Sequence, residues 1–191
     1  MSDSIEIANV GQLPHDEQAI REQIKDANTA YQYKKAKLEE SLAKQDSIIA
    51  KAKECLESYN AKLYKFVKTI QLRTKEIGHY KTQLGKVREK IQSNPNNQQL
   101  RQLERDIECE VAKKERELQE AQKRKEDVEK AIEALKAKID KLQRERNKTQ
   151  ALYSWLVGPG ARELERTKKI LENEANKIRS IFIKANSRPS M

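Results

Sequence analysis

A seven-residue repeat of apolar side chains runs through most of this chain and limits what it can fold into. One series recurs through the first half, at Leu42, Ile49, Leu56, Leu63, Ile70, Ile77, Leu84 and Ile91. A second series falls four residues before these positions, with the apolar members Leu38, Ala52, Tyr59, Phe66, Tyr80 and Val87. Two interleaved heptad series that extend beyond roughly three or four repeats are typical of a coiled coil. The pattern predicts one helix over about residues 16–92.

The same pattern resumes in the second half of the chain. Its main apolar members are Leu100, Ile107, Ala121, Val128, Leu135 and Leu142. This series predicts a second helix over about residues 97–157. Glycine and proline at positions 158–160 are expected to end it, because neither residue continues a helix without cost. Beyond them, Leu164, Leu171 and Ile178 predict a third, shorter helix over about residues 161–187.

The segment IQSNPNNQQL, residues 91–100, is the cluster of turn-forming residues between the first two helices. In an unbroken rod the first series would continue from Ile91 to residue 98, which is a glutamine; instead it restarts at Leu100. Coiled-coil interruptions usually insert three or four residues, and a two-residue shift is neither. Pro95 also disfavours helical geometry at the preceding Asn94. A hairpin is therefore favoured over a kinked rod that pairs with other chains.

A hairpin makes a specific prediction about which residues face one another. Opposed positions should have residue numbers that sum to about 191, which pairs Leu84 with Ile107. The second helix would then end before it reaches the start of the first. The third helix either continues alongside this overhang, with Leu164 near Ala27, or reverses and packs back on the hairpin. The sequence leaves both courses open.

Composition supports a helical fold without a thick core. Of the 191 residues, 37% are charged and only 36% are hydrophobic, which is typical of long helices. The expected fold class is all-α: an elongated coiled coil made of a long antiparallel helical hairpin plus a shorter third helix. The expected domains are a flexible N-terminal arm at 1–15, the coiled-coil hairpin at 16–157, and a C-terminal helix with a short tail at 158–191.

Several features predict an intracellular protein, either cytoplasmic or nuclear. No apolar run is long enough to cross a membrane, and no secretory signal precedes the first helix. Cys55 and Cys109 lack metal-binding spacing and are expected to be free thiols. We therefore do not expect a membrane partner.

The chain offers no pattern of catalytic residues. It contains no glycine-rich phosphate loop, no H-E-x-x-H motif and no nucleophile elbow. His15 and His79 lie far apart on any helical arrangement. The sequence therefore predicts no enzyme activity, no cofactor and no metal site.

Apolar side chains outside the heptad seam indicate contacts with partner proteins. A hairpin alone buries little surface to offset its chain entropy, so an obligate partner is expected. Six of the candidate interface residues lie off the seam: Tyr64, Val67, Leu72, Trp155, Ile170 and Ile181. Three more are seam residues: Tyr153 and Leu156, beside Trp155 in an apolar cluster at a helix end, and Phe182 of the third helix. For the aromatic cluster near residue 155, a hydrophobic plug under the third helix is an equally good interpretation.

The predicted function follows from these surfaces. We expect a non-enzymatic scaffold or adaptor subunit of a multi-protein complex, of the kinetochore, spindle, mRNA-processing or tethering type. Its expected partners are other coiled-coil subunits, from the same or another gene.

A row of lysines supports two alternatives to the scaffold function. With a net charge of +10, the chain carries lysines on the side of the first helix that faces away from the seam: Lys34, Lys37, Lys44, Lys51, Lys62 and Lys65. Such a row is commonly just a solvated face. It also fits a basic nucleic-acid-associated or virion-associated protein, or a helical dimer on a membrane surface.

Several seam positions of the heptad repeat hold polar residues. They are Gln45, Arg73, Lys114, Lys125, Arg146 and Thr149. They either reach water from a partly wet seam or pair with acidic groups on other chains and fix the register. Gly78 and Gly85, one heptad apart, either admit a close neighbour or mark a softer stretch of helix.

Overall fold

A computed structural model describes residues 11–187 of the chain, so most of the expected N-terminal arm and the last four residues lie outside it. The elements are α1 (Leu13–Ser93), α2 (Gln98–Trp155), the π-helical turn η1 (Leu156–Gly160) and α3 (Ala161–Asn186). Within the described residues there is no strand. The all-α fold class and the helical hairpin are confirmed.

The chain divides into two compact units. The turn unit is Ser47–Gln143, and the junction unit combines Met1–Asp46 with Arg144–Met191, described from residue 11 to residue 187. Helix α1 therefore contributes its second part to the turn unit and its first part to the junction unit.

The turn between α1 and α2 is short, and none of its residues has a positive φ. The Asn97 amide donates to the Asn94 carbonyl over 3.1 Å, with Pro95 between them. No residue in 11–187 has a positive φ, which excludes a type II turn because that form needs positive φ at its third residue. The side chain of Asn97 accepts a hydrogen bond from the Leu100 amide (3.2 Å) and so caps the start of α2.

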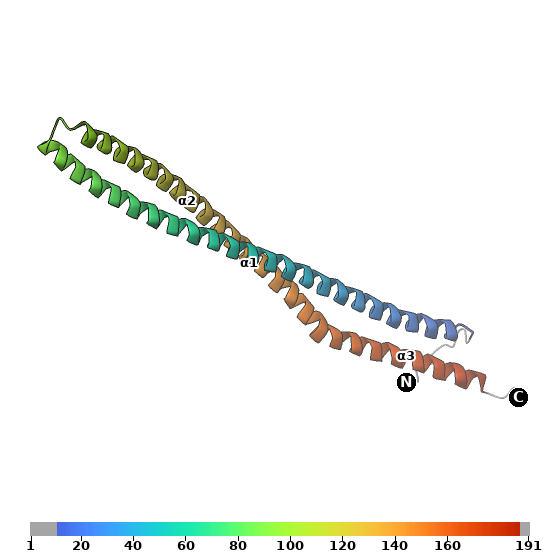
Figure 1. Cartoon of the computed structure of the whole chain (residues 1–191). Helices are drawn as coiled ribbons and strands as arrows, with labels where there is room; N and C mark the ends of the chain where they lie inside the picture. Colours follow the sequence, from blue (N-terminus) through green and yellow to red (C-terminus); the bar gives the residue numbers. More distant parts are fainter. Residues whose placement is uncertain (1–10, 188–191) are drawn as a thin grey trace. The chain divides into compact units, whose positions relative to one another are not determined.

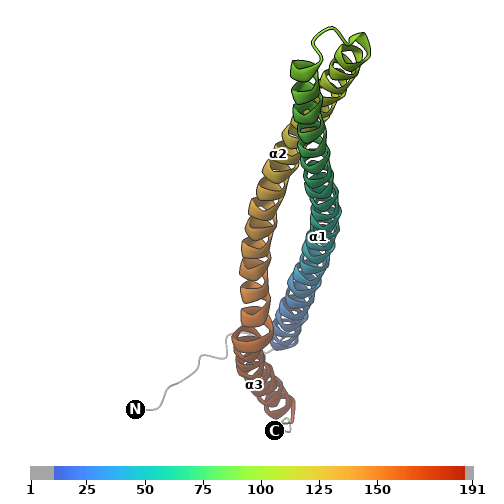
Figure 2. The ribbon, with the colours of Figure 1, turned by 60° about the vertical axis from the view of Figure 1, so that its left-hand side comes forward.

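In the turn unit, α1 and α2 run side by side in opposite directions (Figures 1 and 2). A cluster of buried residues lies near the turn and comprises Leu84, Val87, Ile107 and Val111, with Tyr80 and Ile91 packed against it. The predicted pairing of Leu84 with Ile107 is therefore confirmed. The kinked-rod alternative is wrong for this chain, because the first helix pairs with the second helix of the same molecule.

The junction of α2 and α3 differs from the expectation that residues 158–160 end the helix. The backbone stays helical through them, with φ −62° and ψ −39° at Gly160. In an ordinary α-helix the Pro159 ring would clash with the carbonyl four residues earlier, which belongs to Trp155. The wider π-helical turn at Leu156–Gly160 gives that carbonyl room.

In the junction unit, α3 continues alongside the first part of α1, as the blue and red ends of the ribbon show (Figure 1). Leu164 and Ala27 line the same groove, as the first of the two courses predicts. Ala175 of α3 is fully buried. Within residues 11–187 no helical stretch has the length and hydropathy that a membrane crossing requires.

Candidate partner-binding surfaces

Two seam positions of the turn unit, Arg73 and Lys114, are charged, and Glu76 and Glu117 lie beside them. Arg73 Nη1 donates to Glu76 Oε2 over 2.6 Å, and Arg73 Nε lies 2.8 Å from Glu117 Oε2, an ion pair too bent for a hydrogen bond. Lys114 Nζ lies 3.6 Å from Glu76 and 3.5 Å from Glu117. The hydrogen bond from Arg73 lowers the pKa of Glu76. These seam charges are thus matched inside the chain and need no acidic groups from another protein.

Two further clusters of ion pairs link α1 and α2 nearer the turn. The Arg88 guanidinium donates to Glu104 (2.9 Å) and to Glu108 (2.6 Å), and Lys81 Nζ lies 2.8 Å from Glu115. All of these side chains are at the edge of the seam, where solvent weakens each pair. Their positions sum to values close to the predicted 191, so they agree with the register of the apolar layers.

Polar seam residues of the junction unit also pair within the chain. Arg146 Nε donates to Asp46 Oδ1 over 2.8 Å, which lowers the pKa of that carboxyl. The Gln45 amide donates to Thr149 Oγ1 over 3.2 Å. The Gln45 carbonyl oxygen Oε1 is buried without a hydrogen-bond partner, so the polar seam residues of this unit are paired within the chain only in part.

Tyr153 belongs to the hairpin rather than to a free surface. Its half-buried side chain donates a hydrogen bond to Glu39 Oε1 over 2.8 Å, across from α2 to α1. That hydrogen bond, together with desolvation, raises the pKa of the phenol. Of the predicted interface residues, Tyr153 thus has its polar group already paired.

A groove in the junction unit lies beside the π-helical turn, and exposed Trp155 is one of the residues that line it. It is lined by Ala27, Ala30, Tyr31, Lys34, Trp155, Leu156, Gly160, Glu163, Leu164 and Thr167. Trp155 is 56% exposed and Leu152, one turn earlier, is 61% exposed. Leu156 is half-buried, so it fits the plug interpretation, whereas Trp155 does not. Leu152 and Trp155 together are called the junction surface below.

Gly160 allows the Trp155 ring to sit where it does. A Cβ atom at position 160 would lie 3.2 Å from the ring carbon Cζ3 of Trp155. This is closer than side chains normally approach, so a larger residue would displace the ring. The indole therefore rests on the π-helical turn with one side and leaves its other side open.

The remaining predicted interface residues are distributed over the two units. Ile170 is 60% exposed on α3, and Ile181 and Phe182 are half-buried. In the turn unit, Tyr64 and Leu72 are 61% and 53% exposed, and Val67 is half-buried. Exposed Leu152 was missed by the sequence reasoning, although its place off the seam was a signal that could have found it.

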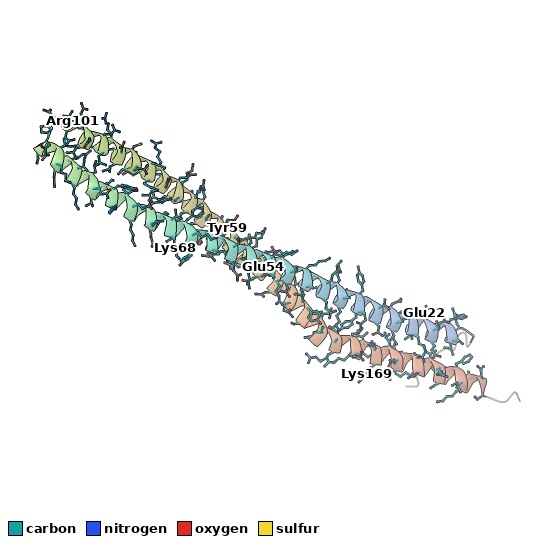
Figure 3. The ribbon with its side chains drawn as sticks, viewed as in Figure 1. Glu22, Glu54, Tyr59, Lys68, Arg101 and Lys169 are labelled. Atoms are coloured by element: carbon teal, nitrogen blue, oxygen red, sulfur yellow. The ribbon has the colours of Figure 1, made fainter. Side chains whose placement is uncertain are left out.

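All six lysines of the predicted row are exposed. Lys34, Lys37 and Lys44 belong to the junction unit, and Lys51, Lys62 and Lys65 to the turn unit. Lys44 pairs with Glu40 at 2.5 Å, and the Lys62 ammonium lies 5.0 Å from the centre of the Tyr59 ring. The side chains of Tyr59 and its neighbours are shown in Figure 3.

The described residues contain no cluster of three or more His, Cys, Asp or Glu side chains that could hold a metal ion. Cys55 and Cys109 are both free and exposed. The polar groups that do converge are complementary charges of the seam, an arrangement that stabilises helix pairing.

The comparisons with known proteins agree with the fold. No protein-family model matches the chain, and no curated protein matches it. Among solved structures, it is similar to the crystal structure of a coiled-coil segment (residues 345–468 and 694–814) of Pyrococcus yayanosii Smc. The identity is 16%, with 94% of this chain and 85% of that chain covered and a TM-score of 0.56. The chain has a coiled-coil fold.

Proposed function

We propose that this chain is a non-enzymatic coiled-coil scaffold or adaptor subunit of a multi-protein assembly. The observation that carries the proposal is the junction surface, where Leu152 and Trp155 are each more than half exposed beside a groove. Large apolar side chains grouped in this way mark protein contacts, and tryptophan is enriched among residues that dominate binding energy.

The charged seam residues pair with acidic residues of the same chain, which supports an adaptor whose partners bind outside the hairpin. Because Arg73, Lys114 and Arg146 all find acidic partners in the same chain, these seam charges do not require a second helix. The exposed apolar side chains lie elsewhere on the helices. Partners would therefore add to the outer faces of a finished hairpin.

The proposal is tested by the size of the native assembly. In extracts of cells that express the tagged chain, size-exclusion chromatography should place the wild type in a complex well above the 22.2 kDa of the free chain. The double variant Leu152→Ser with Trp155→Ser should move to the elution position of the free chain, because it removes the apolar contact.

A matched control keeps this test specific. Asn147 and Ala151 are exposed positions on the same helix, and the double variant Asn147→Ser with Ala151→Ser should stay in the complex. Circular dichroism of the purified variants should show unchanged helix content. A wild type that elutes as the free chain, or a Leu152→Ser, Trp155→Ser variant that stays in the complex, would contradict the proposal.

A further inference from the structure

One stretch of α1 in the turn unit carries positive charge without any negative charge. From Ser58 to Lys75 the sequence contains no Asp or Glu. Lys62, Lys65, Lys68 and Lys75 are all exposed, and none of them forms an ion pair with a carboxylate of residues 11–187. What sets this stretch apart is its lack of carboxylates, so its positive charge is not offset within the same segment of α1 and would attract an acidic ligand.

Two large apolar side chains lie among these lysines. Tyr64 and Leu72 are 61% and 53% exposed, and the Lys68 ammonium lies 4.6 Å from the centre of the Tyr64 ring. Figure 3 shows Lys68 on the side of α1 that faces away from α2. The helical spacing puts five side chains on this side: Tyr64, Lys65, Lys68, Leu72 and Lys75. We call them the lysine–tyrosine face.

We propose that the lysine–tyrosine face binds an acidic amphipathic helix of a partner protein. Such a helix would lay its apolar stripe over Tyr64 and Leu72 and set its glutamates or aspartates against the lysines on either side. The proposal rests on the proposed function and names the chemistry of one partner.

A second copy of this chain is a poorer occupant. Two lysine–tyrosine faces placed together would oppose like charges. Over residues 126–137, the outer side of α2 offers exposed acidic residues, such as Glu126 and Glu133, but the exposed apolar residues of that stretch are the alanines Ala134 and Ala137. It therefore supplies the charge for the lysines without an apolar counterpart for Tyr64 and Leu72.

A nucleic-acid backbone is also a poorer occupant. Phosphate contacts would use the lysines and give affinity that falls steeply with salt. They would leave Leu72 exposed, because an aliphatic side chain gains nothing from a phosphate. An amphipathic helix uses both kinds of residue.

The same side of α1 also has room for a helix beyond Lys75. Gly78 and Gly85 share the heptad position of Tyr64, and a Cβ atom at either glycine would meet nothing within 4 Å. A helix lying over Tyr64 can therefore continue beyond Lys75 and come close to the α1 backbone.

The experiment uses the purified full chain and a labelled synthetic peptide helix with a narrow leucine stripe flanked by glutamates. Fluorescence anisotropy should show binding of this peptide to the wild type. Either Lys65→Glu with Lys68→Glu, or Tyr64→Ser with Leu72→Ser, should weaken binding by about tenfold or more, because each removes one half of the contact. The matched variant Lys123→Glu with Lys130→Glu makes the same charge change on the outer side of α2 and should bind like the wild type.

Two further probes separate the competing ligands. A peptide with the same glutamates but serines in place of the leucines should bind at least about tenfold more weakly. A single-stranded RNA oligonucleotide should not compete at physiological salt. No binding of the leucine peptide, equal binding of the serine peptide, or RNA binding that Tyr64→Ser with Leu72→Ser leaves unchanged would each overturn the inference. Size-exclusion chromatography of the native assembly tests the junction surface separately. If the chain stays in its complex but fails the peptide tests, only this further inference is overturned.

Discussion

Arg73, Glu76, Lys114 and Glu117 show how single residues set the alignment of this hairpin. Each lies partly buried, and each has an oppositely charged neighbour on its own or the facing helix. A shift of one helix along the other would separate Arg73 from Glu117 and Lys114 from Glu76. Each charge would then keep only the partner on its own helix. Losing the cross-helix partners costs stability, so the cluster disfavours other registers.

The paired carboxylates predict that acid destabilises the fold. Hydrogen bonds from Arg73 and Arg146 hold the pKa values of Glu76 and Asp46 below their ordinary values of 4.5 and 3.8. Their contribution is fully present above the pKa of the unfolded chain and is lost as the pH falls through the lower, folded pKa. The thermal midpoint, followed by circular dichroism, should therefore fall below about pH 4.5.

The variant Glu76→Gln isolates this effect. It should be less stable than the wild type at neutral pH, and the difference should shrink on acidification because the wild-type carboxylate is then protonated. A difference between the two proteins that stays constant from neutral pH to about pH 2 would show that the ion pair does not stabilise the fold.

At the scale of the element, α1 contains two glycines that its own fold does not require. Neither Gly78 nor Gly85 has a positive φ, and a Cβ atom at either position would have no neighbour within 4 Å. Alanine loses less backbone entropy in a helix, so Gly78→Ala and Gly85→Ala should each raise the free energy of unfolding by about 1 kcal/mol. Urea denaturation measures this change.

The control for the glycine variants is Ala61→Gly, at another exposed position of α1 in the turn unit. It should lower the free energy of unfolding by a similar amount, about 1 kcal/mol. Destabilisation by Gly78→Ala or Gly85→Ala would show that the backbone there needs the freedom of glycine.

The heptad pattern predicted most of the fold, because it reports which side chains are buried. The shift between Ile91 and Leu100 was enough to predict the turn and the pairing of Leu84 with Ile107. A side chain's place in a seam depends mainly on its own helix, so local periodicity carries that information.

The pattern could not predict features that depend on two elements at once. Whether Arg73 pairs with Glu117 or reaches water depends on the stagger of two helices. Continuation of the helix through Pro159 depends on the packing of α3 against α1, which offsets the unfavourable helix propensity of three residues. The partner surfaces were predicted mainly from residues off the seam, and they remain predictions about binding.

At the scale of the whole molecule, the two units differ in how much they bury. Of the ten buried apolar residues in 11–187, nine belong to the turn unit, and Ala175 alone belongs to the junction unit. Stability that depends on apolar burial should therefore be unevenly divided between them.

Hydrogen exchange measured by mass spectrometry should show this difference. Backbone amides near Leu84 and Ile107 should be protected longest, whereas those near Ile20 and Ile170 should exchange sooner, because local opening there exposes less apolar surface. Equal protection of the two units would contradict the prediction. Binding of a partner at the junction surface should slow exchange mainly in the junction unit.

The turn at residues 94–97 has a consequence for how the sequence and length of this connection can change. Since no residue there needs a left-handed backbone, the connection places little demand on its sequence. Doubling the length of a flexible connection costs only about 0.6 kcal/mol. We therefore expect that residues inserted at this end of the hairpin would leave the paired helices as they are.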